Sequence, residues 1–206
     1  IHIMPSMNPD GFEKAREGDR SGGAGRENAD NRDLNRGFPS RLDEVKASLT
    51  SHLRPKLTFP STLQTSDREP EVAAGMKWSA QHPFVLSANL HGGSLVANYP
   101  FDNNDKGRRV LSSTADDAKF REISMVYSKK HKKMHLGHPC ANERESFQDG
   151  ITNGAKWYVL KGGMQDWNYW YTNDFEITLE LGCFKYPYHQ QLGTYWDCLL
   201  YTSPSP

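Results

Sequence analysis

Five side chains in three separate segments carry groups that can catalyse or bind: His91, Glu180, Arg26, Asn35 and Arg36. His91 ends a mostly apolar run at residues 84–90, and two glycines follow it. Open α/β sheets bind ligands outside the carboxyl ends of their strands, which is where this pattern places His91. An imidazole there can ligate a metal or transfer a proton, although a lone histidine at such a position is more often structural.

Glu180 lies in the clearest alternating pattern of the chain. Apolar residues at positions 175, 177, 179 and 181 point to one face of a predicted strand, while Glu176, Thr178 and Glu180 point to the other. A single acidic residue in such a strand is usually solvated or ion-paired. It becomes a candidate for acid–base chemistry only when a partner lies beside it.

The stretch from Asn8 to Pro39 is rich in Gly, Asn, Asp and Arg and shows no hydrophobic periodicity. Such a stretch is either disordered or an ordered functional loop. Its Arg26, Asn35 and Arg36 offer two guanidinium groups and one amide, which together suit a bidentate grip on a carboxylate or phosphate. Arginines in polar loops are mostly solvated, so the loop alone leaves both interpretations open.

The elements that must position these residues follow an α/β order. A helix is predicted from Pro70 to Ala80, because Pro stands at its first position and an acidic residue in its first turn. The apolar run 84–90 directly after it predicts a strand covered on both faces. A second helix is predicted after Thr114, with apolar side chains on one side and lysines at its far end. Helix, strand and Gly-rich turn in this order are typical of α/β domains.

Composition narrows the function classes. The 206 residues include 25 Lys and Arg against 25 Asp and Glu, so the net charge is zero and a nucleic-acid partner is not expected. No apolar run approaches the roughly 20 residues that a membrane-spanning helix needs. Three cysteines leave disulfide pairing open. Residues 1–4 are predicted as the middle of a buried strand, so the chain is expected to begin inside a domain.

Seven segments together closely resemble the zinc metallocarboxypeptidases. Their residues match the regulatory branch of this family, which contains carboxypeptidases N, E, M and D. They are NPDGFE (8–13), GREN (25–28), DLNR (33–36), SANLHGGSLVANYPFD (87–102), DGITNGAKWY (149–158), GGMQDWNY (162–169) and EITLELGC (176–183). The resemblance covers about residues 1–196. It implies an α/β fold with a mixed, mostly parallel central sheet flanked by helices, whose N-terminal part is missing from this chain.

The resemblance also implies domain limits. Residues 1–197 correspond to a partial metallocarboxypeptidase catalytic domain. The family's final helix is not expected after Trp196, and residues 198–206 resemble neither that helix nor the domain that follows it. A non-native tail is therefore expected there.

The metal site implied by the resemblance is a zinc site. His91 matches the later of two zinc-binding histidines, while the His-x-x-Glu pair that supplies the other two ligands has no counterpart in this chain. Two of three ligands are thus expected upstream of Ile1, and residues 1–206 alone are expected neither to hold zinc tightly nor to hydrolyse peptides.

The remaining catalytic groups implied by the resemblance are Glu180 and Arg26. Glu180 matches the general base that accepts a proton from the metal-activated water. Arg26 matches the arginine that stabilises the oxyanion of the tetrahedral intermediate.

Substrate binding is implied for five further residues. Asn35 and Arg36 match the pair that binds the substrate's terminal carboxylate, and Tyr158 matches the tyrosine that closes over the C-terminal residue. Asp102 and Gln165 match the polar residues of the specificity pocket. An anionic pocket favours C-terminal Arg or Lys, so peptides or proteins with these C-termini are the expected substrates.

Two alternatives remain beside the enzyme. This branch includes members that keep the fold and lose catalytic or zinc-binding residues, so a non-catalytic module that binds peptides or proteins is the main alternative. An unrelated soluble α/β domain is the other. Relatives act in the secretory pathway or outside the cell, and the same localisation is expected here by analogy.

Overall fold

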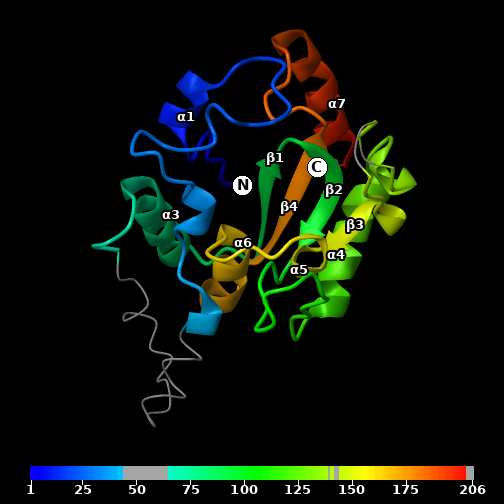
Figure 1. Cartoon of the computed structure of the whole chain (residues 1–206). Coiled ribbons are helices and arrows are strands. Elements are labelled where there is room, and N and C mark those ends of the chain that lie inside the picture. The colour runs from blue at the N-terminus through cyan, green and yellow to red at the C-terminus, as the bar shows by residue number, and fades with distance from the viewer. Residues whose placement is uncertain (44–64, 139, 142–143, 203–206) are drawn as a thin grey trace.

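The computed structural model describes residues 1–43, 65–138, 140–141 and 144–202, and the side chains of residues 199–202 are not among those described. Its centre is a four-stranded sheet in the order β1-β4-β2-β3 (Figure 1). The strands are β1 (Leu86–His91), β2 (Ser94–Tyr99), β3 (Ile151–Asn153) and β4 (Phe175–Gly182). β1 runs parallel to β4 and β2 parallel to β3, while β2 and β4 are antiparallel. The predicted mixed, mostly parallel sheet is confirmed.

Helices and short turns surround this sheet. The helices are α1 (Pro9–Lys14), α3 (Pro70–Gln81), α4 (Asp117–Lys130), α5 (Gly154–Trp157), α6 (Met164–Trp167) and α7 (Leu192–Thr202). Short helical turns are η1 (Leu34–Arg36), η2 (Met134–Leu136), η3 (Gln148–Gly150), η4 (Asn168–Thr172) and η5 (His189–Gln191). In Figure 1, α3 lies on the side of the sheet where β1 forms the edge, and α4 lies beside β2. The predicted helices at 70–80 and after Thr114 are both confirmed.

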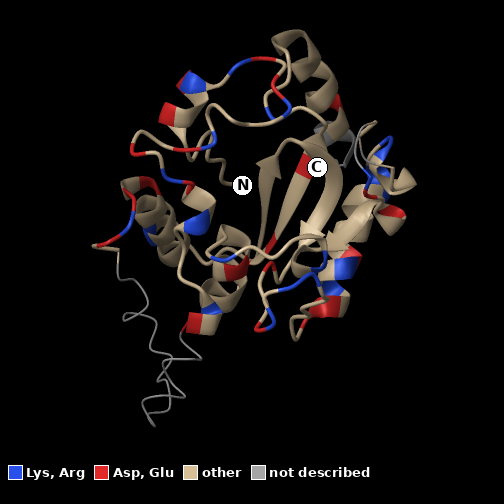
Figure 2. Ribbon diagram, viewed as in Figure 1, with Lys and Arg blue, Asp and Glu red and all other residues tan. Residues whose placement is uncertain are grey.

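β4 shows the predicted alternation and separates two environments. Ile177 and Leu179 pack with Phe120 of α4 in one apolar cluster. On the opposite face Glu176 and Glu180 are buried. Figure 2 shows acidic positions on the strands of the sheet. This polar face is covered by α6 and η4, whose Trp167 and Tyr171 belong to a second cluster. The carboxylates of β4 are therefore enclosed and not solvated.

β1 differs from its prediction. It was expected to be covered on both faces, yet Leu86 is 59% exposed and Leu90 52% exposed. Residues 1–4 do not form the predicted buried strand either, and Ile1 and Ile3 are fully or largely exposed. Both expectations rested on apolar composition, which shows that a segment can pack but not which element covers it. Among the described residues, β1 has only β4 as a neighbour.

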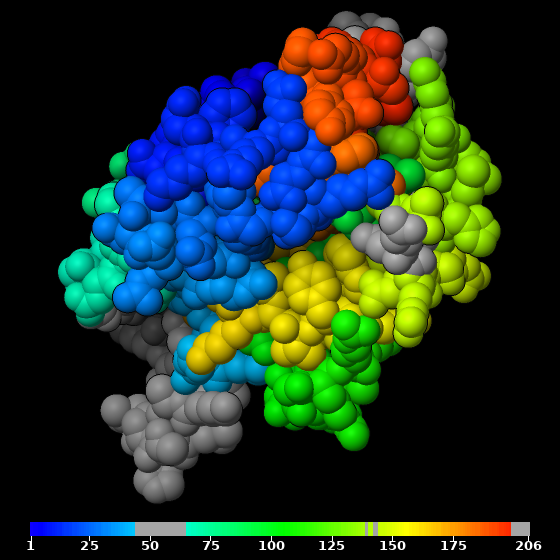
Figure 3. All heavy atoms as spheres, turned by 45° about the horizontal axis from the view of Figure 1, so that its top comes forward, coloured from blue at the N-terminus to red at the C-terminus, as the bar shows by residue number. Residues whose placement is uncertain are grey.

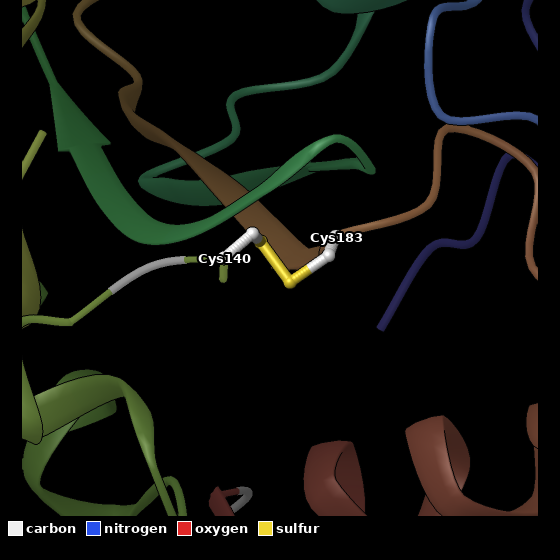
Figure 4. Close-up of a disulfide and its surroundings, with 2 residues drawn as sticks. All are labelled: Cys140 and Cys183. Atoms are coloured by element: carbon white, nitrogen blue, oxygen red, sulfur yellow. A yellow bond between two sulfur atoms is a disulfide. The ribbon is translucent and has the colours of Figure 1, made fainter. Parts of the chain in front are cut away.

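A disulfide fastens the end of β4. Cys140 and Cys183 are bonded, with Cα atoms 5.4 Å apart, so the bond ties the segment after η2 to the residue that directly follows β4 (Figure 4). Cys198 belongs to no disulfide in the described part of the chain. The bond settles the pairing that the sequence left open.

The end of the chain also differs from its prediction. No final helix was expected after Trp196, but α7 continues to Thr202. Residues 192–202 contain one glycine and no proline, so nothing interrupts the helix before Pro204. Whether residues 198–206 are a non-native tail stays a prediction. No helix in the described part of the chain is long and apolar enough to span a membrane.

Candidate functional site

His91 and Glu180 come together because their strands are parallel neighbours. The two residues are Cα partners in the β1–β4 register, at the carboxyl end of both strands. The Nδ1 atom of His91 lies 3.6 Å from Oε1 of Glu180. The Glu180 side chain is only 3% exposed, and its Oε2 atom has no hydrogen-bond partner among the described residues. A buried carboxylate beside a histidine ring is a combination that can bind or catalyse, so the pair is a candidate reactive centre.

The polar stretch at residues 8–39 is an ordered loop. Asn28 is 1% exposed, and its amide donates to Glu69 and Glu71 at the start of α3. Its carbonyl oxygen accepts the backbone N–H groups of Asp30 and Arg32. A buried amide with all these bonds fixes the loop to the body of the protein. The stretch is therefore ordered, and its role in binding stays a prediction.

Asp33 organises the two arginines of that loop. Its Oδ2 atom accepts a hydrogen bond from Nε of Arg26 at 3.0 Å and lies 3.6 Å from Nη1 of Arg36. Its Oδ1 atom accepts the backbone N–H of Asn35 at the start of η1. The guanidinium groups are paired but still partly exposed, at 34% and 43%. They remain free to contact an anion from the solvent side.

Asp33 was not among the sequence candidates. Its sequence signals are its place in the DLNR segment (33–36) and its position seven residues after Arg26 and three before Arg36.

Asp102 is a buried acidic residue near this loop. It is 4% exposed, and its Oδ1 atom accepts hydrogen bonds from Nε2 of Gln165 at 3.1 Å and Nδ2 of Asn98 at 3.2 Å. Burial raises the pKa of Asp102 to about 6, while the hydrogen bond from Asn98 lowers it. His91 and Arg36 also lower this pKa by their charges, so both lie near enough to Asp102 to act on its carboxylate.

Gly163 lies between Asp102 and Asn35, and so joins the acidic part of the site to the part that contains the arginine loop. A Cβ atom at this position would lie 3.3 Å from Oδ2 of Asp102 and 3.6 Å from Oδ1 of Asn35. Asn35 is held there because its Oδ1 atom accepts the N–H of Met164 at 2.9 Å. The carboxylate of Asp102 and the amide of Asn35 thus flank a single glycine.

Tyr158 lies over the same group of charges. Its side chain is half-buried, and burial raises its pKa to about 12. The negative charges of Asp102 and Glu180 raise this pKa further, while those of Arg36 and Arg26 lower it. At neutral pH the phenol is therefore un-ionised and able to donate a hydrogen bond. In Figure 3 the loop at residues 8–39 and the segment at 150–165 lie side by side, with strand residues visible between them.

The structure brings together all the sequence candidates: His91, Glu180, Arg26, Asn35, Arg36, Tyr158, Asp102 and Gln165. The site has two arginines at one side, a buried acid at another and a histidine–carboxylate pair at its base. Such a set can bind a molecule that carries both an anionic and a cationic group.

A complete metal centre is not present in the described residues. Zinc in hydrolases is bound by three protein ligands and a water molecule. No group of three His, Cys, Asp or Glu side chains within the described ranges is placed to hold a metal ion. His91 can supply one ligand, and the described residues do not fit a full zinc site.

A family model described as zinc carboxypeptidase matches residues 1–201. The chain belongs to the zinc carboxypeptidase family. Its sequence is 51% identical to carboxypeptidase D of Anas platyrhynchos and 49% identical to carboxypeptidase D of Homo sapiens, in each case over 199 residues. It is also 45% identical to the carboxypeptidase N catalytic chain of Rattus norvegicus over 207 residues.

This zinc carboxypeptidase chain spans only part of these relatives. The alignments cover 96% of the chain but 13% of either carboxypeptidase D, and 95% of the chain but 44% of the carboxypeptidase N catalytic chain. Among solved structures, carboxypeptidase A from Helicoverpa armigera has the same fold, with a TM-score of 0.57 and 18% identity over 97% of this chain and 49% of that one. The predicted carboxypeptidase fold, in partial form, is confirmed.

Proposed function

We propose that the protein containing this chain is a zinc-dependent exopeptidase that removes C-terminal Arg or Lys from peptides or proteins. One observation carries the proposal: Asp102 and Asn35 flank Gly163, so a buried acid lies next to the groups expected to bind a carboxylate. A C-terminal Arg or Lys residue carries a carboxylate and a cation only a side chain apart. It therefore matches both halves of the site at once.

Residues of the η1 turn recognise the C-terminal end of the substrate. Arg36 and the amide of Asn35 bind the terminal carboxylate, and Asp33 keeps both in place. The phenol of Tyr158 donates to the bound residue and covers it. An internal peptide has no carboxylate for Arg36, which confines cleavage to the last bond.

Asp102 and Gln165 select the side chain of the substrate's C-terminal residue. When Asp102 is ionised it pairs with a guanidinium or ammonium group, while the free Oε1 atom of Gln165 accepts a further N–H. An apolar side chain would leave this buried carboxylate unpaired. That cost disfavours C-terminal Phe or Leu.

Bond cleavage uses Glu180 and Arg26. Glu180 accepts a proton from the attacking water and delivers it to the leaving amine. Arg26 stabilises the negative oxygen that develops on the scissile carbonyl. Zinc, when bound, supplies the positive charge that makes a water molecule nucleophilic at neutral pH. Because the described residues offer only His91, the proposal requires two further ligands from elsewhere in the protein.

The disulfide supports an oxidising location. Cys140 and Cys183 are bonded, and such bonds persist mainly in the secretory pathway and outside the cell. We therefore place the protein there, as the family analogy also does.

The test compares three substrates that differ in one residue, benzoyl-Gly-Arg, benzoyl-Gly-Lys and benzoyl-Gly-Phe, with the full-length protein. Arg and Lys should be released with a kcat/KM at least about a hundredfold above that for Phe, because an unpaired buried carboxylate costs several kcal/mol. A preference for Phe would overturn the pocket assignment. Residues 1–206 alone should show no chelator-sensitive activity.

The alternative is a non-catalytic module that binds C-terminal Arg or Lys. Its support is the incomplete metal site in the described residues. Full-length protein that binds a peptide ending in Arg, takes up no zinc and releases no Arg would establish this alternative.

A further inference from the structure

A second buried carboxylate, Asp166, lies directly behind Asp102. Asp166 is 8% exposed and belongs to α6, next to Gln165 in sequence. Its Oδ1 atom accepts the backbone N–H of Asp102 at 2.8 Å. It also accepts a hydrogen bond from the backbone N–H of Asn103, which lowers its pKa against the larger effect of burial. One carboxylate thus binds two consecutive backbone groups of the segment that carries Asp102.

α6 therefore holds Asp102 at two points. Gln165 donates to the carboxylate of Asp102 at 3.1 Å, and Asp166 accepts from its backbone at 2.8 Å. The first contact orients the side chain and the second fixes the main chain from which it projects. Without the backbone contact from Asp166, the hydrogen bond from Gln165 alone does not define where the carboxylate lies.

Two carbonyl groups of this segment are bonded to the chain on either side of Tyr158. The oxygen of Phe101 accepts the N–H of Ala155 at 2.9 Å, and the oxygen of Asp102 accepts the N–H of Leu160 at 2.8 Å. Both donors flank Tyr158 in sequence. The Asp102 N–H itself donates to Asp166, so this contact is separate from the two carbonyl bonds.

Space around Asp102 is limited as well. A Cβ atom at Gly154 would overlap its Oδ1 atom, and one at Gly163 would press on its Oδ2 atom. The carboxylate fits because both neighbours are glycines. A small shift of the backbone at Asp102 would therefore bring the carboxylate against α5 or away from Gln165, and charged hydrogen bonds weaken steeply with misalignment.

Two close carboxylates repel one another, and Arg41 offsets that repulsion. The charge of Asp102 raises the pKa of Asp166, while the charge of Arg41 lowers it. The Arg41 guanidinium lies 3.8 Å from the ring centroid of Phe101 and donates to the oxygen of Asn103 at 3.0 Å. It is thus anchored to the segment that Asp166 holds.

We propose that Asp166 is a positioning residue for substrate selection: by binding the backbone N–H groups of Asp102 and Asn103, it sets the place of the carboxylate that pairs with a C-terminal Arg or Lys. This inference rests on the proposed function. It adds a residue that acts on the substrate only through Asp102.

The test uses the full-length protein and the variants Asp166→Asn, Asp166→Ala and Asp102→Asn. Asn is isosteric with Asp, but its single carbonyl oxygen accepts one of the two N–H groups well and its NH₂ opposes the other. The matched control is Asp174→Asn. Asp174 is 1% exposed, and its partner is the hydroxyl of Ser87 at 2.7 Å, on the same side of β4.

Asp166→Asn should lower the ratio of kcat/KM for benzoyl-Gly-Arg to that for benzoyl-Gly-Phe about tenfold, the effect of one misaligned charged hydrogen bond. KM for benzoyl-Gly-Arg and the inhibition constant of free arginine should both rise. The kcat for benzoyl-Gly-Phe should be unchanged. Asp102→Asn should lower the same ratio more, and Asp174→Asn should leave it unchanged. If Asp166→Ala does not fold, Asp166→Asn decides alone.

A purely structural role would lower thermal stability and total activity for all three substrates equally. An unchanged Arg-to-Phe ratio in Asp166→Asn, alongside a reduced ratio in Asp102→Asn, overturns the inference and leaves the proposed function standing. A wild-type protein that prefers Phe overturns both.

Discussion

His91 and Glu180 face each other across β1 and β4, with Nδ1 of His91 3.6 Å from Oε1 of Glu180. The contact is set by strand register, since a shift of one residue would turn the Glu180 side chain to the apolar face with Ile177 and Leu179. The sheet therefore fixes the relation between a candidate metal ligand and a candidate base, and this relation does not depend on loops.

Glu180→Gln should lower kcat of the full-length protein by about a thousandfold, because general acid–base catalysis contributes roughly two to four orders of magnitude. KM for an Arg-terminated substrate should change little, since Glu180 is not assigned to binding. Steady-state kinetics measure both values, and bound zinc is assayed in parallel.

Glu176→Gln is the matched control for that variant. Glu176 lies on the same face of β4, and burial raises its pKa to about 8, so it is largely protonated at pH 7 and resembles an amide. Equal losses of kcat in both variants would contradict a specific role for Glu180.

Binding of basic C-termini should weaken at acid pH. Burial raises the pKa of Asp102 to about 6, and only the ionised form pairs with a cation. KM for benzoyl-Gly-Arg should therefore rise as pH falls through about 6, and it should level off above that value. KM for benzoyl-Gly-Phe should lack this transition. If the pH transition in KM persists in Asp102→Asn, it arises from another group and the prediction is wrong.

Asp33→Asn should impair both binding of the terminal carboxylate by Arg36 and stabilisation of the oxyanion by Arg26. The amide oxygen still accepts from the N–H of Asn35, but the charge that holds Arg26 and Arg36 is gone. Both pairs are partly exposed, so the cost to stability should stay within about 1 kcal/mol. We expect kcat/KM to fall about tenfold or more through the looser geometry of the two guanidinium groups. Asp19→Asn, in the same loop but bonded to Ser21, serves as the control.

Removal of the Cys140–Cys183 disulfide by a double substitution to Ala should lower the free energy of unfolding by about 2–4 kcal/mol. The bond closes a loop between residues 43 positions apart, and its loss frees the unfolded chain. Denaturant titration measures the change. Substitution of Cys198, which belongs to no disulfide in the described part of the chain, should not open a closed loop and serves as the control.

The sequence predicted this fold where periodicity carried the information. The alternation in β4 correctly separated the apolar face from the acidic one, and long motifs identified the residues that meet at the site. The exposure of β1 was missed, because an apolar run does not show whether another element covers it. Asp33 and Asp166 were missed because an acidic residue gains meaning only from the donors that the tertiary structure brings to it.

The hydrogen bonds around Asp102 also restrict how this pocket can change in evolution or engineering. An aliphatic residue in place of Asp102 would strand the amides of Gln165 and Asn98, which now donate to its carboxylate, and would leave both without an acceptor in a buried position. Conversion to a preference for apolar C-termini should therefore need coordinated substitutions at positions 98, 102 and 165. Single substitutions should pass through variants that bind neither class of substrate well.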